Sequence, residues 1–203
     1  PPYGINIASM NMGAGKGARC SNIRNRKWKP KQWDNSPPDI EYFNELMRVS
    51  ANQIVWGGNY FDLGPCKHYV IWDKEIPDGL SFADCEMAWT SIERAPRMFR
   101  YSAYNDKADK FHPTQKPIAL YRWLLHNYAK PGDKILDTHV GSASSLIACH
   151  EKGFRYVGFE LDPDYYAAAK ARLDKAKAQA SIFDAAPEPR AEQLALIGGP
   201  DGT

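Results

Sequence analysis

The chain has 203 residues, of which 43% are hydrophobic and 25% are charged, so size and composition predict one soluble globular domain. The formal net charge of +2 excludes a polycation, and the absence of a run of about eighteen apolar residues argues against a transmembrane helix. The four cysteines have no Cys-x-x-Cys spacing, and no histidine pair stands at ligand spacing, so we expect free thiols and no metal site.

Basic residues gather near the start of the chain, where no acidic residue occurs up to Trp33. This stretch contains Lys16, Arg19, Arg24, Arg26, Lys27, Lys29 and Lys31. Such a segment is typical of a surface that contacts phosphates, although a solvated loop has the same composition. The residues alone leave both interpretations open.

The first half of the chain predicts a loop, a helix and three strands. Residues 1–37 are rich in Gly, Asn, Pro and Lys, which predicts a long loop. Apolar residues recur at helical spacing over Asp39–Val49, after a Pro-Pro-Asp start. Short apolar or β-branched runs predict strands at Gln53–Trp56, His68–Asp73 and Cys85–Thr90. Residues 92–111 are polar and basic, and we expect an irregular loop there.

The second half predicts an alternation of helices and strands. Pro117 opens a helix that extends to about Tyr128. It is followed by a strand, a helix, a second strand and an Ala-rich helix, at Lys134–Asp137, Ser142–Glu151, Tyr156–Glu160 and Pro163–Ala176. This βαβ pattern predicts an α/β fold with a doubly wound, mostly parallel sheet. After Ala178 we expect a tail.

The βαβ unit suits a ligand that contains adenosine. Asp137 and Glu160 end its two strands about twenty residues apart, the spacing at which the second acid can accept ribose hydroxyls. The turn around Gly141 lacks a full Gly-x-Gly-x-x-Gly, which disfavours NAD and FAD. S-adenosyl-L-methionine needs fewer glycines because it has no pyrophosphate, and its positive charges favour a carboxylate such as Asp137. The unit alone leaves the identity of the ligand open.

Four segments together resemble the DNA amino-methyltransferases. They are Pro1-Pro2-Tyr3-Gly4, NQIVWGGNYF at 52–61, HPTQKP at 112–117, and 137–145. Their order resembles the circularly permuted beta group of that family, and in particular its compact phage and prophage adenine enzymes. The resemblance covers Pro1 to about Leu173. It implies the Rossmann-like fold of class I S-adenosylmethionine-dependent methyltransferases.

The family motif places Asp, Ser or Asn before Pro-Pro-Tyr, and this position precedes Pro1. The resemblance therefore implies a preceding strand, so that the natural start lies upstream. It also implies a role for each matching residue. The Pro1 carbonyl would accept from the target amine, with Pro2 beside it, and Tyr3 would stack on a flipped base. The cofactor would contact Thr114, Gln115, Lys116, Asp137, Gly141, Ser142 and Glu160.

The expected organisation is a catalytic half at 1–91, a short recognition loop at 92–111, a cofactor-binding half at 112–178 and a tail at 179–203. Because larger relatives insert a recognition domain where this chain has about twenty residues, we expect a short or relaxed target sequence. The partner would be double-stranded DNA, with no membrane and with a homodimer as one assembly, in the cytoplasm of a bacterial or phage-infected cell. Expected DNA contacts are Lys16, Arg19, Arg24, Arg26, Lys27, Trp28, Lys29, Lys31, Arg97 and Arg100.

The expected reaction is transfer of a methyl group from S-adenosyl-L-methionine to adenine N6. The Thr-Gln-Lys-Pro and Trp-Gly-Gly-Asn-Tyr-Phe segments favour adenine. The alternatives are a cytosine N4 methyltransferase, an enzyme that acts on RNA or on a protein glutamine, and a catalytically impaired remnant that binds DNA or cofactor.

Overall fold

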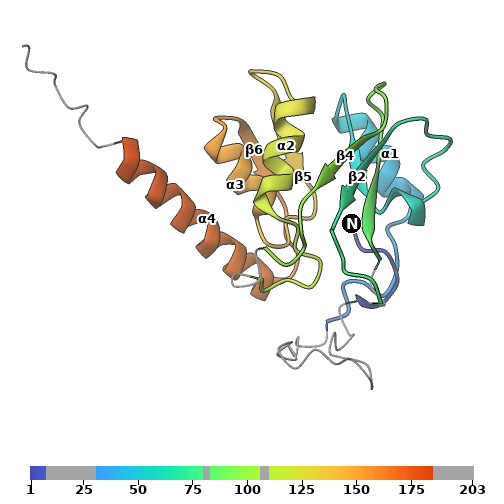
Figure 1. Cartoon of the computed structure of the whole chain (residues 1–203), viewed down its shortest axis with the longest axis horizontal. Helices are drawn as coiled ribbons and strands as arrows, with labels where there is room; N and C mark the ends of the chain where they lie inside the picture. The colour runs from blue at the N-terminus through green and yellow to red at the C-terminus, as the bar shows by residue number, and fades with distance from the viewer. Residues whose placement is uncertain (8–30, 80–82, 106–109, 185–203) are drawn as a thin grey trace, which may run out of the picture.

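The computed structural model describes residues 1–7, 31–79, 83–105 and 110–184. Within them, two groups of strands are flanked by helices (Figure 1). Most of the basic segment, residues 8–30, and residues 185–203 of the expected tail lie outside the described residues. No helix in the described part of the chain has the length and apolar character needed to cross a membrane.

The first group is a four-stranded mixed sheet with the strand order β1-β3-β2-β4. Its strands are β1 (Ile54–Trp56), β2 (Tyr69–Asp73), β3 (Cys85–Thr90) and β4 (Arg97–Arg100). β3 pairs antiparallel with β1 and β2, whereas β4 pairs parallel with β2. The antiparallel β2–β3 pair makes this sheet mixed, where the sequence predicted mostly parallel pairing.

The short strand β4 corrects the prediction that residues 92–111 form an irregular loop. Ile71 is in register with Met98, and Trp72 with Phe99. Phe99 packs on the core beside Trp123 while Met98 is exposed, so the strand alternates as a half-buried edge strand does. The polar composition hid this pattern because Arg97 and Arg100 flank only two apolar residues.

Three helical elements surround this sheet. α1 (Ile40–Val49) begins at Asp39, whose carboxylate accepts the Tyr42 N–H at 2.9 Å as an N-cap. A short 3-10 turn, η2 (Gly58–Tyr60), follows β1 directly. α2 (Ile118–Tyr128) covers one face of the sheet. The core between α2 and the sheet contains Trp56, Val70, Trp72, Ala88, Leu120 and Leu124.

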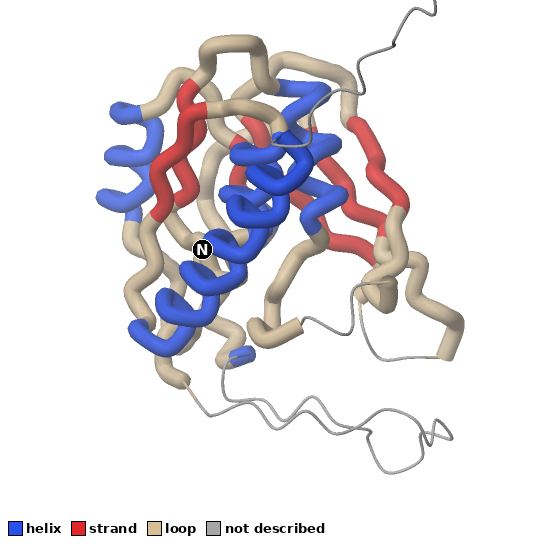
Figure 2. Tube along the Cα trace, turned by 90° about the vertical axis from the view of Figure 1, so that its left-hand side faces the viewer, coloured by secondary structure: helices blue, strands red, loops and turns tan. Residues whose placement is uncertain are grey.

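The second group is the predicted βαβ unit. β5 (Lys134–Asp137) and β6 (Arg155–Gly158) pair in parallel, joined by α3 (Ser144–Glu151). α3 begins two residues later than predicted because Ala143 adopts a left-handed conformation, with φ of +61°. The final helix α4 (Pro163–Asp184) crosses the front of the molecule in Figure 2. It extends past Ala176, so residues 179–184 are helical and the expected tail does not begin there.

Helix α2 belongs to two cores at once. Leu120 and Leu124 pack on the four-stranded sheet, and Leu125 packs with Ala148 and Cys149 of α3. α2 therefore lies between the two groups of strands and holds them in position relative to each other.

Candidate active site

The N-terminal segment, residues 1–7, is attached to a single buried residue. Asp34 has no exposed surface, and its Oδ1 accepts the N–H groups of Tyr3 at 2.6 Å and Gly4 at 3.1 Å. Its Oδ2 accepts the Ile7 N–H at 2.8 Å. The Asp34 carbonyl also accepts the Asn6 N–H at 3.1 Å. One residue, about thirty positions away in sequence, thus organises the Pro-Pro-Tyr main chain.

The Tyr3 ring lies against the turn that follows β1. It stacks on Tyr60 with ring centroids 4.9 Å apart and planes 11° apart, and Phe61 lies 6.2 Å away at a tilt. A Cβ atom added to Gly57 would come within 2.2 Å of Tyr3 Cε1. Glycine at 57 is therefore what lets this backbone reach the Tyr3 ring.

A buried ion pair lies beside the Tyr3 hydroxyl. Lys116 Nζ is 2.9 Å from Glu86 Oε2 and 5.3 Å from the centre of the Trp56 ring. Burial alone would lower the pKa of Lys116, but Glu86 and Tyr3 outweigh this and raise it. Burial raises the pKa of Tyr3, while the Lys116 ammonium that interacts with it opposes the shift. Lys116 and Tyr3 thus form one electrostatic unit.

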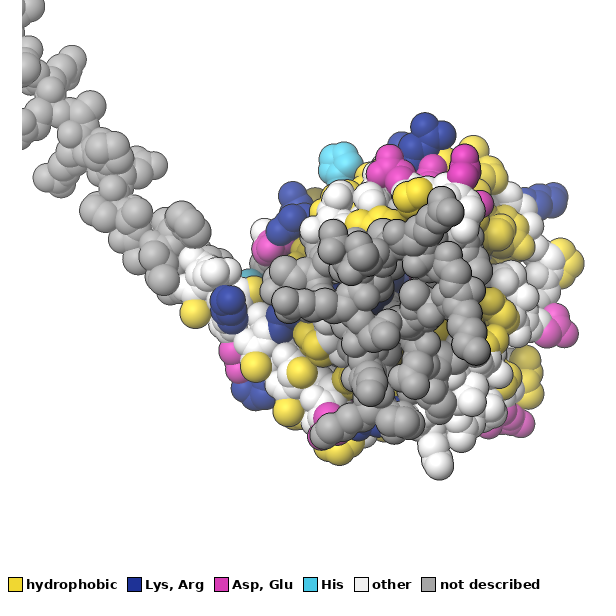
Figure 3. Space-filling view, turned by 60° about the horizontal axis from the view of Figure 1, so that its bottom comes forward, with side chains coloured by type: hydrophobic (Ala, Val, Ile, Leu, Met, Phe, Trp, Pro, Cys, Tyr) yellow, Lys and Arg dark blue, Asp and Glu magenta, His cyan; other side chains and the backbone are white. Residues whose placement is uncertain are grey.

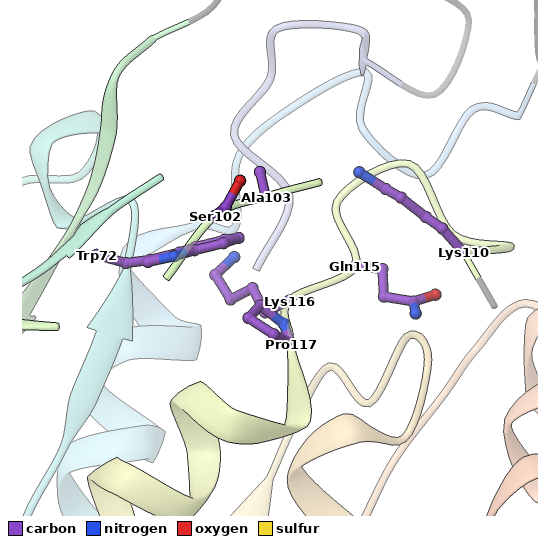
Figure 4. Close-up of a pocket in the computed structure, with 7 residues that line it drawn as sticks. All are labelled: Trp72, Ser102, Ala103, Lys110, Gln115, Lys116 and Pro117. Atoms are coloured by element: carbon purple, nitrogen blue, oxygen red, sulfur yellow. The ribbon is translucent and has the colours of Figure 1, made fainter. Parts of the chain in front are cut away.

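The position of Lys116 bears on its expected role at the cofactor. Its side chain extends toward Trp72 and Ser102, while Gln115 extends to the other side of the loop (Figure 4). The cavity that these residues line, together with Ala103, Lys110 and Pro117, has about 30 Å³, which is enough for a water molecule. The ammonium of Lys116 is directed to Glu86 and Tyr3, and this geometry favours a role on the catalytic side.

The rest of the HPTQKP segment contacts the βαβ unit. His112 Nδ1 lies 3.3 Å from the Thr114 nitrogen and 3.2 Å from its hydroxyl. The His112 ring lies 4.3 Å from the Tyr165 ring and stacks at 5.3 Å on Trp33. Burial first, then Lys116 and Lys110, lower the pKa of His112 to about 3. A neutral imidazole in this position fits a packing role.

The Gly141 loop, residues 137–145, connects β5 to α3. Asp137 Oδ1 accepts the His139 N–H at 2.9 Å, and its Oδ2 accepts the Ser145 hydroxyl. Glu160 Oε2 accepts the Gly141 N–H at 2.8 Å, and its Oε1 accepts the Asp162 N–H at 3.0 Å. The two acids predicted from the sequence therefore fix the shape of the loop itself.

Two further contacts hold this loop. Arg172 of α4 donates to the carbonyl of Ser142 at 2.8 Å and to the Ser144 hydroxyl at 2.9 Å. On the opposite side, the Tyr42 hydroxyl of α1 lies 2.7 Å from Thr138 Oγ1. A helix from each half of the molecule thus contacts the Gly141 loop.

The predicted catalytic and cofactor-binding residues come together across the two halves. Asp34 holds the Tyr3 main chain, and the neighbouring Trp33 stacks on His112 with ring centroids 5.3 Å apart. A Cβ added to Gly141 would be 3.6 Å from the His112 ring. The predicted residues at the start of the chain, in HPTQKP and in the Gly141 loop therefore border one region. Within the described ranges, no group of three or more His, Cys, Asp or Glu side chains is placed to hold a metal ion.

The structure describes only three of the ten residues that were predicted to contact DNA, namely Lys31, Arg97 and Arg100. Lys16, Arg19, Arg24, Arg26, Lys27, Trp28 and Lys29 lie outside the described residues. Lys31 forms ion pairs with Asp162 at 2.9 Å and Asp164 at 2.6 Å, so its ammonium is already engaged at the start of α4.

The two arginines of β4 are described, and both have partners. Arg97 lies over the Trp123 ring at 5.7 Å, while Arg100 pairs with Asp73 at 3.3 Å and keeps 71% of its side chain exposed. On the face shown in Figure 3, basic and acidic side chains both lie along the visible rim.

Sequence reasoning missed Asp34, Glu86 and Tyr60. Asp34 is the first acidic residue of the chain, directly after the basic segment, and this isolation was a signal that could have singled it out. Glu86 is a charged residue inside a strand, opposite Trp72 in the neighbouring strand, which is a second such signal. No sequence pattern pairs either residue with Tyr3 or Lys116, because these contacts join distant parts of the chain.

The comparisons agree with this architecture. The solved structure of M1.HpyAVI matches with a TM-score of 0.50 and 17% identity, over 68% of this chain and 83% of that one. This likeness shows the fold, which is the Rossmann-like α/β fold of class I methyltransferases. A family model described as DNA methylase, covering the N6 and N4 enzymes, matches residues 21–171. The chain belongs to this N6/N4 DNA methylase family.

Relatives in the family include type II methyltransferases. M2.DpnII from Streptococcus pneumoniae is 31% identical over 147 residues, which are 70% of this chain and 49% of that protein. M.HpaI from Haemophilus parainfluenzae is 37% identical over 76 residues, or 37% of this chain and 24% of that protein. The chain spans about half or less of the length of these relatives.

Proposed function

We propose that the protein is a DNA methyltransferase that transfers a methyl group from S-adenosyl-L-methionine to N6 of a flipped adenine. The observation that carries the proposal is that Asp34 holds the Tyr3 main chain while its neighbour Trp33 stacks on His112, which lies against Gly141. Family membership and the type II methyltransferases among the relatives support DNA as the substrate. The choice of adenine follows from the resemblance of the HPTQKP and WGGNYF segments to adenine enzymes.

The residues around Glu160 fit the proposed cofactor. Glu160 stands at the end of β6, and two exposed apolar side chains flank it, Phe159 at 56% and Leu161 at 96% exposure. An apolar surface beside a carboxylate suits a purine with its ribose hydroxyls. Asp137 and the Gly141 loop would hold the methionine portion, with the carboxylate opposing its positive charge. When bound, the cofactor would supply an electrophilic methyl group.

The chain's own residues would orient the target base. The Tyr3 ring would stack on the base, which offsets about 1–3 kcal/mol of the cost of flipping. The Pro1 carbonyl would accept a hydrogen bond from the exocyclic amine, whose nitrogen then presents its lone pair to the methyl carbon. On transfer, the sulfur of the cofactor would keep the electron pair of the broken S–C bond, and the proton lost by the amine would pass to solvent. Orientation and electrostatics supply the catalysis.

The test is methylation of DNA by the full-length protein with methyl-labelled cofactor, followed by nucleoside analysis. Label in N6-methyladenine is expected, and Tyr3→Ala should abolish it. Tyr166→Ala, which removes an exposed ring on α4, is the matched control and should retain activity. Label in N4-methylcytosine would overturn the choice of base, and no label in DNA would overturn the enzyme assignment.

Target recognition can be tested separately on random-sequence DNA. Among the described residues of the interval 92–111, β4 is the only helix or strand, so we expect a short or relaxed target sequence. Mapping of methylated positions should give a site shorter than about six bases, since few side chains can reach base edges. A longer, strict site would contradict this expectation.

A further inference from the structure

Asp34 is a buried carboxylate that nothing in the proposed chemistry uses. Its carboxylate accepts main-chain N–H groups of the segment that contains Pro1 and Tyr3. We propose that Asp34 is a positioning residue that fixes the Pro-Pro-Tyr main chain and thereby sets the Tyr3 ring in its base-stacking position. This inference rests on the proposed function, because Tyr3 matters to catalysis only if a base stacks on it.

The geometry of the N-terminal segment supports this role. Gly4 and Asn6 both adopt left-handed conformations, with φ of +71° and +59°. Alternation of this kind turns successive N–H groups toward one side of the chain and forms a concave site for an anion. Here the Asp34 carboxylate occupies that site and accepts from Tyr3, Gly4 and Ile7. The shape of the loop and the negative charge of Asp34 therefore depend on each other.

Gly4 packs closely against the residues that follow Asp34 in the chain. A Cβ on Gly4 would lie 2.7 Å from Pro37 Cδ, so the main chain rests directly on the residues that follow Asp34. A buried carboxylate is tolerated only when hydrogen bonds replace its hydration, and the three amide donors provide this. The segment and Asp34 thus form one rigid unit, and movement of either would displace Tyr3.

The residue before Asp34 links this unit to the cofactor side. Trp33 stacks on His112 at 5.3 Å, and His112 packs on Tyr165 of α4. Residues 33 and 34 therefore connect the HPTQKP segment to the Pro-Pro-Tyr main chain. Through this connection, Asp34 fixes the position of the Tyr3 ring relative to the Gly141 loop, where the methyl donor is proposed to bind.

The experiment compares Asp34→Asn and Asp34→Ala with the matched control Asp39→Asn in the full-length protein. Asp39 also accepts a backbone N–H through its carboxylate, but it is exposed at the start of α1. Asp34→Asn is the mild variant, since it keeps one acceptor oxygen and sets an amide N–H against the Ile7 N–H. It should lower kcat on the order of 100-fold, the loss expected when a catalytic group shifts by about 1 Å.

Two readouts separate positioning from general destabilisation. Cofactor affinity measured by calorimetry should stay within about twofold, because Asp137 and Glu160 are not altered. With the protein labelled with 3-fluorotyrosine, the Tyr3 ¹⁹F resonance, assigned by Tyr3→Phe, should shift in Asp34→Asn and stay in place in Asp39→Asn. A Tyr3 resonance and a kcat unchanged in both Asp34 variants would overturn the inference.

The two proposals can fail separately. If the unaltered protein transfers no methyl group to DNA, the proposed function fails, while the Tyr3 resonance still decides whether Asp34 sets the ring. If Asp34→Ala does not fold, the kcat and the Tyr3 ¹⁹F resonance of Asp34→Asn decide whether Asp34 positions the ring. Loss of kcat with an unmoved Tyr3 resonance would also count against positioning.

Discussion

The two halves of the molecule hold their functional residues in different ways. In the proposed cofactor-binding half, Asp137, Gly141 and Glu160 lie within one continuous βαβ unit, where Glu160 accepts the Gly141 N–H. In the proposed catalytic half, Tyr3 depends on Asp34, on the turn at Gly57 and on Lys116, which come from three separated parts of the chain. The first site is held mainly from within its own half, whereas the second is assembled from segments that lie far apart in the sequence.

This difference has a consequence for how each half responds to change. The Gly141 loop should tolerate most substitutions in the other half, because Glu160 and Arg172 hold it from its own half. A ring held by distant contacts is sensitive to each of them, since the loss of one lets the ring move. Substitutions around Tyr3 should therefore affect catalysis strongly, even where they touch neither base nor cofactor.

The turn at Gly57 provides the strongest test of this sensitivity. Gly57 has φ of +72°, and a Cβ there would overlap the Tyr3 ring at 2.2 Å from Cε1. Gly57→Ala should lower the methylation rate on the order of 100-fold by displacing Tyr3. Gly64→Ala is the matched control, because Gly64 has φ of +75° and nothing within 4 Å of the added Cβ. Equal activities of the two variants would contradict the tertiary assembly of this site.

The buried ion pair of Lys116 and Glu86 gives the next largest effect, this time on stability. Lys116→Met leaves the partly buried Glu86 with only the more distant Lys74, 3.9 Å away, as its ion-pair partner, which should lower the free energy of unfolding by about 1–3 kcal/mol. The double variant Lys116→Met/Glu86→Leu should recover part of that loss, because Glu86 is no longer left without its nearest partner, although Lys74 loses its own contact with Glu86. Urea unfolding of both variants measures these changes in the free energy of unfolding. A single variant as stable as the unaltered protein would show that the pair contributes little.

Glu160 tests the proposed cofactor-binding half. Glu160→Gln keeps one acceptor oxygen but loses the negative charge and one of the two loop hydrogen bonds. Affinity for S-adenosyl-L-methionine should fall on the order of tenfold, about 1.4 kcal/mol, while the Tyr3 site keeps its geometry. Calorimetry on this variant and on Glu45→Gln, an exposed residue of α1, provides the comparison. A larger effect on kcat than on cofactor affinity would contradict the separation of the two halves.

Lys31 should give the smallest effect, and it tests the end of the basic segment. Because its ammonium pairs with Asp162 and Asp164, burial of a DNA phosphate against it would require breaking both ion pairs. Lys31→Gln should therefore leave the slope of log affinity against log salt unchanged. Arg100→Gln, which alters a largely exposed guanidinium, should reduce that slope by about one. A reduced slope for Lys31→Gln would show that Lys31 does contact a DNA phosphate.

The same contrast explains which features the sequence could predict. The strands at 85–90 and 134–137 have the predicted bounds, and α1 begins directly after Asp39 as expected, because these elements follow local periodicity and capping. β4 was missed, since two apolar residues between arginines make too short a pattern. The extension of α4 beyond Ala176 was missed because the helix there has no clear apolar face.

The candidate site divides in the same way. The Gly141 loop was predicted with its acids because glycine turns and strand-end carboxylates have fixed spacings. Asp34 and Glu86 were not predicted as site residues. A single carboxylate produces no periodic pattern in the sequence, and its partners are known only from the folded structure. Lys116 was predicted within its motif, but only the fold reveals that its ammonium is directed to Glu86.

Helix α2 has a consequence for how the molecule unfolds. Its Leu120 and Leu124 complete one core and its Leu125 the other, so neither group of strands can lose this helix without exposing its own apolar residues. The two halves should therefore melt as one cooperative unit, with a single transition by any probe. A protein whose catalytic and cofactor-binding parts share one helix cannot keep half a site folded.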